Sequence, residues 1–180
     1  MNLDKLNPGG MQPADGDWLR KYALVWGGPV FEIGVEYGNS TAYIYRGLLD
    51  RRNRGLQLRG EKLIIFSVDV QDVRDVAIPR QVFYRARSVD VVPPLQCRWA
   101  FIDGDHTRAG VRADILHCQK LGIERMILHD ARQGDPTDGK NTQLGTDVYV
   151  AAMETFDEKW NLHVIDTPCG LLIASKQCLS

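Results

Sequence analysis

Residues 62–70 read KLIIFSVDV, a stretch in which apolar side chains follow one another almost without interruption. A strand with one face in solvent alternates apolar and polar residues, whereas a parallel strand that is covered on both faces is apolar nearly throughout. This stretch therefore predicts a buried parallel strand. Further strands are predicted along the chain at 29–34 (PVFEIG), 81–86, 98–103 (RWAFID) and 124–130 (ERMILHD).

Segments with helical periodicity lie between these strands. Val111, Ile115 and Cys118 share one face of a helix predicted over Thr107–Leu121, and Gly122 stands where helices commonly end. Other helices are predicted at 15–26 with Asp15 or Asp17 as the cap, at 38–50 and at 146–159, with a weak helix or turn at 72–80. Regular alternation of strands and helices predicts an α/β fold with a doubly wound, Rossmann-like sheet and helices on both of its faces.

The end of the chain departs from this alternation. Two strands are predicted at 162–166 and 171–175, and only a short turn around Pro168–Gly170 separates them. A parallel connection needs a dozen residues or more, so this pair must be antiparallel. The 180 residues thus predict one domain, 15–180, with a mostly parallel sheet, preceded by a flexible lead-in at 1–14.

Composition excludes several classes of protein. Hydrophobic residues make up 44% and charged residues 25%, which is typical of a soluble globular chain, and a net charge of −1 gives no reason to expect nucleic acid or an anionic membrane as a partner. The four cysteines are scattered, which favours neither a zinc site nor disulfides and suits a reducing compartment. Without a signal peptide or a membrane-spanning run, we expect a cytoplasmic protein.

Charged residues also follow the helix at 38–50. An arginine-rich run begins directly after it, where positive charge complements a helix C-terminus. We expect these side chains to be solvated: Arg51, Arg52, Arg54 and Arg59.

Polar residues cluster where the predicted strands end, and in an open α/β sheet this edge is where ligands bind. After the first strand, FEIGVEYGNST at 31–41 places Gly34 and Gly38 in a tight turn, and Ser40 or Thr41 can cap the next helix. The glycine spacing differs from the dinucleotide fingerprint and no Walker lysine follows, so NAD and ATP are disfavoured. A plain strand–turn–helix is the alternative interpretation.

Asp69 closes the strand at 62–70. A carboxylate at that point can accept hydrogen bonds from both hydroxyls of a ribose. The alternative is a helix cap or an ordinary surface side chain.

The densest polar segment is FIDGDH at 101–106. Asp105 can simply cap the following helix. Asp103 and His106 remain, and an imidazole can act as a base near neutral pH while a neighbouring carboxylate tunes its pKa or binds a cation.

His129 and Asp130 end the next strand. Because neighbouring strands lie about 5 Å apart, Asp103, His129 and Asp130 can converge on one divalent cation. Carboxylates suit Mg²⁺, whereas histidine is more usual for Mn, Fe or Zn. The alternative is that His129 bonds a loop carbonyl.

Taken together, these segments resemble a known family. FEIGVEYGNST resembles the first motif of class I S-adenosylmethionine-dependent methyltransferases, and FIDGDHTRAGVRADI followed by ILHD resembles small-molecule O-methyltransferases such as macrolide-sugar methyltransferases and cephalosporin-hydroxylase-like proteins. The resemblance spans about residues 29–175. It implies S-adenosylmethionine as the cofactor and the hydroxyl of a sugar, polyol or natural product as the methyl acceptor.

The resemblance also implies residue roles. Ser88 would lie near the adenine, Asp69 would bind the ribose, and the first motif would surround the methionine part. The cofactor-binding residues would be Glu32, Gly34, Gly38, Ser40, Thr41, Asp69, Ser88 and Asp103. Asp103 and His106 would be catalytic, and Asp103, His129 and Asp130 would hold Mg²⁺ or Mn²⁺.

The chain departs from the family pattern. His129 stands where sugar methyltransferases have Glu, and the connection before the strand at 124–130 is shortened to KLGIER. No sizeable cap domain precedes the fold, so we expect the substrate to be covered by the 131–144 loop, by the first helix or by a second subunit in a homo-oligomer. Alternative functions are another S-adenosylmethionine-dependent or metal-assisted reaction, or a cofactor-binding module without turnover.

Overall fold

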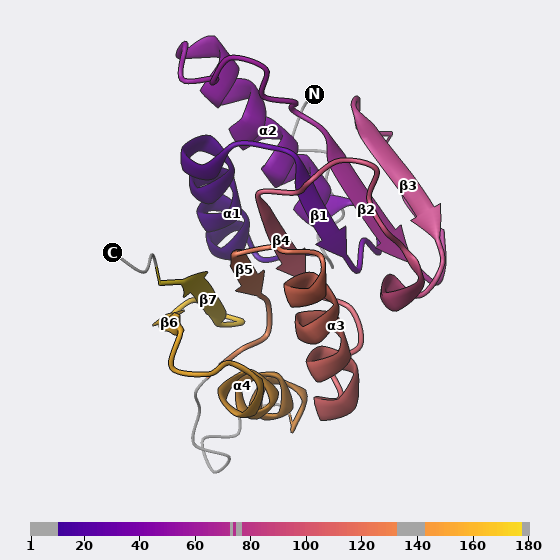
Figure 1. The fold of residues 1–180 in the computed structure, drawn as a ribbon, viewed down its shortest axis with the longest axis vertical. Coiled ribbons are helices and arrows are strands. Elements are labelled where there is room, and N and C mark those ends of the chain that lie inside the picture. Colours follow the sequence, from indigo (N-terminus) through magenta and orange to yellow (C-terminus); the bar gives the residue numbers. More distant parts are fainter. Residues whose placement is uncertain (1–10, 73, 75–76, 133–142, 178–180) are drawn as a thin grey trace.

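A seven-stranded sheet forms the centre of the protein (Figure 1). The structure, a computed structural model, describes residues 11–72, 74, 77–132 and 143–177, with the backbone alone at 143–146. The strands lie in the order β3-β2-β1-β4-β5-β7-β6. Their bounds are β1 Val30–Ile33, β2 Ile65–Asp69, β3 Gln81–Arg85, β4 Trp99–Ile102, β5 Arg125–Leu128, β6 Trp160–Ile165 and β7 Leu171–Lys176.

The directions of the strands confirm the predicted sheet. From β3 to β5 all neighbours are parallel, and β7 runs antiparallel to both β5 and β6. β7 lies between β5 and β6, so the last two strands extend the sheet beyond β5 by an antiparallel hairpin. The α/β fold class predicted from the alternating pattern is therefore correct.

Helices cover both faces of the sheet. The helices are α1 (Pro13–Trp26), α2 (Asn39–Asn53), α3 (Arg108–Lys120) and α4 (Gln143–Thr155), with a short 3₁₀ helix η2 (Ser88–Asp90) after β3. Leu19 of α1 and Leu48 of α2 pack on one face of the sheet, and Ile115 of α3 and Ala152 of α4 pack on the other. Two apolar layers thus enclose the sheet, which explains why its central strands are apolar apart from a few polar residues such as Glu32 and Ser67.

Strand register brings the ends of four strands to one level. Ile33 of β1 pairs with Val68 of β2 and with Ile102 of β4, and Ile102 pairs with Leu128 of β5. The residue after each of these four is therefore at the same edge of the sheet. Those residues are Gly34, Asp69, Asp103 and His129.

Several predicted helix boundaries are wrong. α1 begins at Pro13 with Gln12 as its N-cap, so Asp15 lies inside the first turn and is not the cap. α4 ends at Thr155, because Trp160 pairs with Lys176 and starts β6 earlier than predicted. By contrast, the weak helix or turn predicted at 72–80 agrees with a turn at Pro79 and Arg80 among the described residues. Most of the 131–144 loop and of the 1–14 lead-in lie outside the described residues.

The arginine run is solvated except at its first member. Arg51 is buried, and its Nε donates to Glu61 at 3.0 Å while its Nη1 donates to the backbone carbonyls of Leu24 and Val25. The Glu61 carboxylate also accepts from the backbone N–H groups of Gly28 and Leu58. This buried ion pair is fully hydrogen-bonded, as burial of a charge requires, and it ties the end of α1 to the segment before β2.

Within the described residues, no helix is both long enough and apolar enough to cross a bilayer.

Candidate functional site

The turn after β1 depends on two glycines. Gly34 has φ +81°, and a Cβ there would lie 2.1 Å from the carbonyl oxygen of Asp103, so only glycine lets the β1 and β4 ends approach this closely. Gly38 has φ +86° and precedes α2. The backbone N–H groups of Val35 and Glu36 inside this turn donate to Oδ2 of Asp69 at 2.9 and 3.1 Å. Asp69 therefore shapes the turn as well as facing the cavity.

Glu32 supports this turn from inside the protein. Its carboxylate is fully buried and accepts hydrogen bonds from three hydroxyls: Ser40 (2.7 Å), Thr41 (2.8 Å) and Ser67 (2.6 Å). Burial raises the pKa of Glu32 to about 7, although these hydrogen bonds oppose the shift. Ser40 and Thr41, expected to cap α2, thus fix a buried carboxylate instead.

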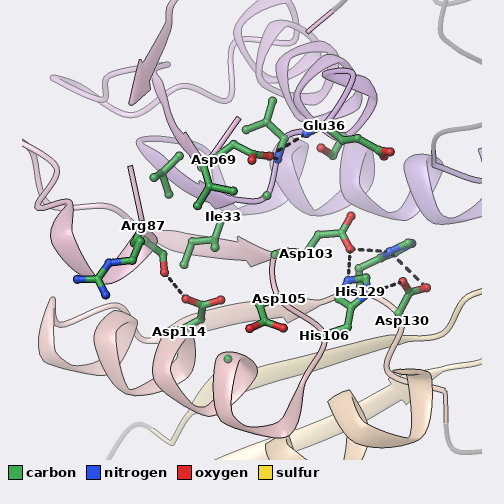
Figure 2. Close-up of a pocket in the computed structure, with 18 of the residues that line it drawn as sticks. Ile33, Glu36, Asp69, Arg87, Asp103, Asp105, His106, Asp114, His129 and Asp130 are labelled. Carbon is green, nitrogen blue, oxygen red and sulfur yellow. Dashed lines mark hydrogen bonds and ion pairs between the residues drawn. The ribbon is translucent and has the colours of Figure 1, made fainter. Parts of the chain in front are cut away.

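Two histidines meet one carboxylate at the ends of β4 and β5. Oδ1 of Asp103 lies 3.1 Å from Nε2 of His106 and 3.0 Å from Nδ1 of His129 (Figure 2). Asp130 lies against both rings at ion-pair distance, 3.6 Å from Nδ1 of His106 and 3.6 Å from Nδ1 of His129. A carboxylate only accepts, so each histidine donates an N–H to Asp103.

The histidine pKa values follow from these contacts. The hydrogen bond with Asp103 raises the pKa of His106, against a smaller lowering by burial. Burial alone would lower the pKa of His129, but its contacts with Asp103, Asp130 and Asp15 raise that pKa strongly. The pKa of Asp103 is lowered by the two histidines although burial opposes this shift.

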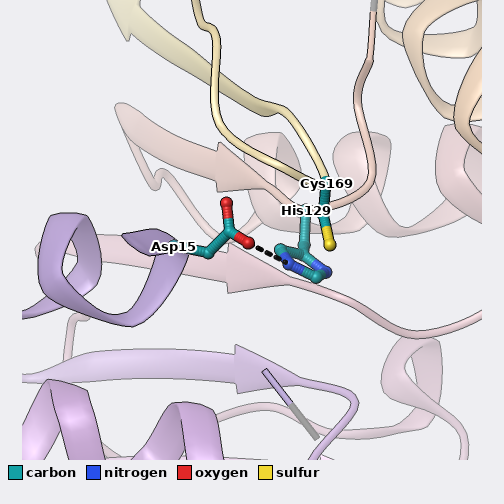
Figure 3. A group of neighbouring side chains, drawn as sticks. All are labelled: Asp15, His129 and Cys169. Atoms are coloured by element: carbon teal, nitrogen blue, oxygen red, sulfur yellow. Dashed lines mark ion pairs between the residues drawn. The ribbon is translucent and has the colours of Figure 1, made fainter. Parts of the chain in front are cut away.

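The other edge of the His129 ring faces α1 (Figure 3). Nε2 of His129 lies 3.7 Å from Oδ2 of Asp15, which is fully buried. Neither Asp15 oxygen nor this nitrogen has a hydrogen-bond partner among the described residues. Together with Cys169 they offer three possible metal-ligand atoms within 4.8 Å of one another. The imidazole of His129 is thus held between two carboxylates, one from β4 and one from the first helix.

A cavity of about 910 Å³ opens at this edge of the sheet. The predicted residues that line it are Gly34, Ser40, Asp69, Ser88, Asp103, His106, His129 and Asp130. Three predicted residues do not line the cavity: Glu32, Gly38 and Thr41. Glu32 contributes indirectly, because it accepts a hydrogen bond from the hydroxyl of Ser40, which does line the cavity. The sheet thus brings together side chains that are far apart in sequence, as their places at strand ends predicted.

Two acidic residues at the site were not singled out from the sequence. Asp15 was expected to cap the first helix, and nothing in the sequence around it predicted a contact with His129. Asp114 lies in the second turn of α3, where an acid on an amphipathic helix is expected to be solvated, yet it is buried and lines the cavity. Its burial depends on the packing of α3 against η2, which no local pattern indicates.

Comparisons with known proteins agree with this architecture. The sequence model of a family described as "Methyltransferase domain" matches residues 31–130. No significant match was found among curated proteins.

Solved structures with the same fold share little sequence with this chain. An O-methyltransferase from Bacillus cereus in complex with SAH superposes with a TM-score of 0.68 at 15% identity, covering 97% of this chain and 86% of its own. TomG from Streptomyces achromogenes, an O-methyltransferase in complex with SAM, superposes with a TM-score of 0.66 at 13% sequence identity, and the match covers 94% of this chain and 82% of TomG. The Podospora anserina methyltransferase PaMTH1, bound to SAH, superposes with a TM-score of 0.63 at 13% sequence identity, and the match covers 98% of this chain and 85% of PaMTH1.

The buried carboxylate beneath the glycine turn generates a prediction on pH and stability. The pKa of Glu32 rises from 4.5 to about 7 on folding, so its contribution to stability is complete below pH 4.5 and is lost as pH rises through 7. The stability of the wild type relative to Glu32→Gln should therefore fall between pH 5 and pH 8, on the order of 2 kcal/mol. Urea unfolding of both proteins at the two pH values measures this, with the exposed Glu158→Gln as the control. An equal gap between wild type and Glu32→Gln at both pH values would contradict it.

Proposed function

Because this chain belongs to the methyltransferase-domain family, we propose that it transfers the methyl group of S-adenosylmethionine to a hydroxyl of a small molecule such as a sugar, a polyol or a natural product. One observation carries the proposal. A single cavity is lined on one side by the Gly34 turn with Asp69, and on another by His106 held against Asp103. The first side suits a nucleoside cofactor, and the second suits a hydroxyl that must lose its proton.

The cofactor half of the proposal rests on the β1 and β2 ends. The absence of a side chain at Gly34 leaves backbone exposed to the cavity beside Asp69, so a ligand can approach the turn closely. The carboxylate of Asp69 retains acceptor capacity for the ribose hydroxyls, because each carboxylate oxygen can accept more than one hydrogen bond. SAH and SAM in the Bacillus cereus and TomG structures support the choice of cofactor.

The reaction is a displacement at the sulfonium. The bond from sulfur to the methyl carbon breaks as the acceptor oxygen forms its bond to that carbon, and the hydroxyl proton leaves to a base. Holding the two reactants in line contributes about 7–11 kcal/mol to lowering the barrier, so positioning is the main task of the protein.

His106 is the base in this proposal. Its Nε2–H donates to Asp103, so in the neutral ring Nδ1 carries the lone pair, and Nδ1 is 3.6 Å from Asp130, too far for a hydrogen bond. Nδ1 can therefore accept the acceptor's proton. The imidazolium that forms is stabilised by the carboxylates of Asp103 and Asp130 on either side.

A divalent cation is part of the proposal. Asp103, His129 and Asp130 offer three ligand atoms within 4.8 Å of one another, so these residues fit such an ion. When bound there, a cation would act as a Lewis acid that lowers the pKa of the acceptor hydroxyl. With His129 as a ligand through Nδ1, its Nε2–H would face Asp15, which matches the common pairing of a metal-bound histidine with a second carboxylate. An imidazole beside two carboxylates favours Mn²⁺ over Mg²⁺.

We also propose a small-molecule acceptor and a homo-oligomeric assembly. Both parts of the proposal rest on the sequence alone. The acceptor would enter beside His106, and Met11 and Gln12, directly before α1, also line the cavity.

The first test is cofactor binding. Wild-type protein should bind SAH in isothermal titration, and Asp69→Asn should weaken that binding by roughly tenfold or more, because an amide presents donors where the ribose needs an acceptor. Asp72→Asn, at an exposed acid just beyond β2, is the control and should bind normally. Failure of the wild type to bind SAH would overturn the proposed function, and normal binding by Asp69→Asn would remove only the ribose assignment.

The second test concerns the base. His106→Ala should retain SAH binding but transfer methyl groups at least about 100-fold more slowly, since a positioned base contributes this much. Transfer of labelled methyl groups to a panel of hydroxylated small molecules measures the rate, and His163→Ala, at an exposed histidine of β6, is the control. Full turnover by a folded His106→Ala protein would exclude His106 from the mechanism.

The third test concerns the cation. Wild-type protein should bind one Mn²⁺ with a changed electron paramagnetic resonance spectrum, and Asp130→Asn should weaken binding by at least about tenfold through loss of a ligand charge. Glu124→Gln, an exposed acid at the other end of β5, should not change it. If wild-type protein binds no Mn²⁺ and methyl transfer survives EDTA, the cation has no part in the reaction.

A further inference from the structure

Three side chains from distant segments meet beside the cavity, at the edge of the His129 ring that faces away from Asp103. Asp15 comes from α1, His129 follows β5, and Cys169 lies in the turn between β6 and β7 (Figure 3). One possible ligand atom of each lies within 4.8 Å of the other two. Leu19 of α1 and Leu171 of β7 share the apolar layer that covers this face of the sheet, so tertiary packing creates the cluster.

Asp15 is a buried acid without a hydrogen-bond partner. Its side chain is fully buried, and among the described residues neither of its oxygens nor Nε2 of His129 takes part in a hydrogen bond. The first turn of α1 favours a negative charge through the helix dipole, but its backbone donates no hydrogen bond to this carboxylate. Buried carboxylates are ordinarily paired, because an unpaired buried charge is costly. A cation between Asp15 and His129 would remove this cost.

The separation of Asp15 and His129 fits a shared metal ion better than a direct hydrogen bond. Oδ2 of Asp15 lies 3.7 Å from Nε2 of His129, which is longer than a hydrogen bond. Two ligand atoms on one tetrahedral zinc ion lie about 3.3–3.8 Å apart, given its bond lengths of roughly 2.0–2.3 Å. Nδ1–H of His129 donates to Asp103 at 3.0 Å, so in the neutral ring Nε2 carries the lone pair. This is the common arrangement of a zinc-binding histidine, whose other nitrogen donates to a carboxylate.

The turn that carries Cys169 is fixed against the segment after β5. The backbone N–H of Ala131, two residues after His129, donates to the carbonyl of Gly170 at 3.1 Å. Gly170 has φ +80°, and a Cβ there would lie 2.7 Å from Cα of Arg132, so only glycine allows this approach. Cys169 itself is half-buried and lines the cavity. The thiol is therefore held beside His129 but remains accessible to an ion that enters through the cavity.

We propose that Asp15, His129 and Cys169 bind one Zn²⁺ ion, through a carboxylate oxygen, Nε2 and the thiolate. Zinc is the ion for which carboxylate, imidazole and thiolate are all usual ligands, whereas thiolate disfavours Mg²⁺ and Mn²⁺. The thiol proton, and any proton on Nε2, leave to solvent when the ion binds. His129 and Cys169 both line the cavity, so a water molecule or a small ligand can take the fourth position. The ion ties α1 to the β6–β7 turn.

This site is distinct from the one proposed for Mn²⁺, although both use His129. The Mn²⁺ site uses Nδ1 together with Asp103 and Asp130, whereas the zinc site uses Nε2 together with Asp15 and Cys169. A ring that keeps its Nδ1–H on Asp103 cannot bind Mn²⁺ through that nitrogen, so the two ions compete for His129. The zinc site rests on its own contacts and not on methyl transfer, and its failure would leave the proposed function intact.

The experiment measures zinc binding to protein freed of metal with a chelator, without added Mn²⁺ or SAH. Isothermal titration with zinc chloride gives the affinity, and the absorption spectrum with Co²⁺ in place of zinc shows whether a thiolate is a ligand. The site variants are Cys169→Ser and Asp15→Asn, and Asp130→Asn tests the neighbouring Mn²⁺ site. The matched controls are Asp17→Asn, at an exposed acid of α1, and Cys97→Ala, at a buried thiol of the core. Thermal unfolding of each metal-free protein checks that it is folded.

The proposal expects wild-type protein to bind one Zn²⁺ ion with a Kd of about 1 μM or tighter, and to unfold at a higher temperature when zinc is bound. Cys169→Ser should weaken binding by at least about 100-fold, since loss of a direct ligand exceeds the roughly 10- to 100-fold cost of losing an outer partner. Asp15→Asn should weaken it by at least about tenfold through loss of the ligand charge. Both controls should bind zinc as the wild type does, and Asp130→Asn should keep the cobalt–thiolate band.

Three outcomes overturn the inference. Absence of zinc binding to folded wild-type protein excludes the site. Wild-type affinity in folded Cys169→Ser, with loss of binding in Asp130→Asn, places the ion at the neighbouring cluster instead. Weakening by Cys97→Ala as strong as that by Cys169→Ser shows a general effect of thiol loss. If Asp15→Asn does not fold, Cys169→Ser still decides, because its residue lies in a turn and not in the core.

Discussion

The register of β1 between β2 and β4 is the constraint on which the site depends. Parallel pairing places Ile33, Val68 and Ile102 side by side, so the next residue of each strand emerges at the same level of the sheet. The close approach between Gly34 and the Asp103 carbonyl follows from this register, and a side chain at Gly34 would not fit. A slip of one residue would turn every side chain of the strand to the other face and would separate the polar groups.

The same constraint makes the charges of the site dependent on one another. Asp103 accepts from two histidines that come from different segments, and Asp15 approaches the far edge of His129 from the first helix. Buried carboxylates and imidazoles of this kind are tolerated because each offsets the desolvation of its neighbour. Glu32 is also a buried acid, but its hydrogen-bond partners are three neutral hydroxyls and not a cation. Because no positive charge offsets its burial, the pKa of Glu32 stays raised. The site thus combines a neutralised acid–histidine cluster with acids that lack a cationic partner.

Each wall of the cavity has its own chemistry, and this division agrees with a ligand of three parts. The glycine turn and Asp69 offer backbone and a carboxylate, the ends of β4 and β5 offer imidazoles and carboxylates, and the wall of η2 and α3 offers apolar surface with one acid. The three solved methyltransferases named above share only 13–15% of their sequence with this chain, so the likeness in fold does not assign the acceptor.

The sequence by itself determined the fold class, the antiparallel end of the sheet and the strand ends at which polar residues gather. These features depend on local periodicity and on connection length, which can be read along the chain. Helix ends were less well predicted, as at Thr155, because pairing of Trp160 with Lys176 outweighs the local helical pattern. Only the tertiary structure decided which edge of His129 faces which acid and that Asp15 and Asp114 are buried at the site. Both acids lie on helices whose packing against distant segments sets their environment, and a helical pattern records which residues share a face but not what that face will meet.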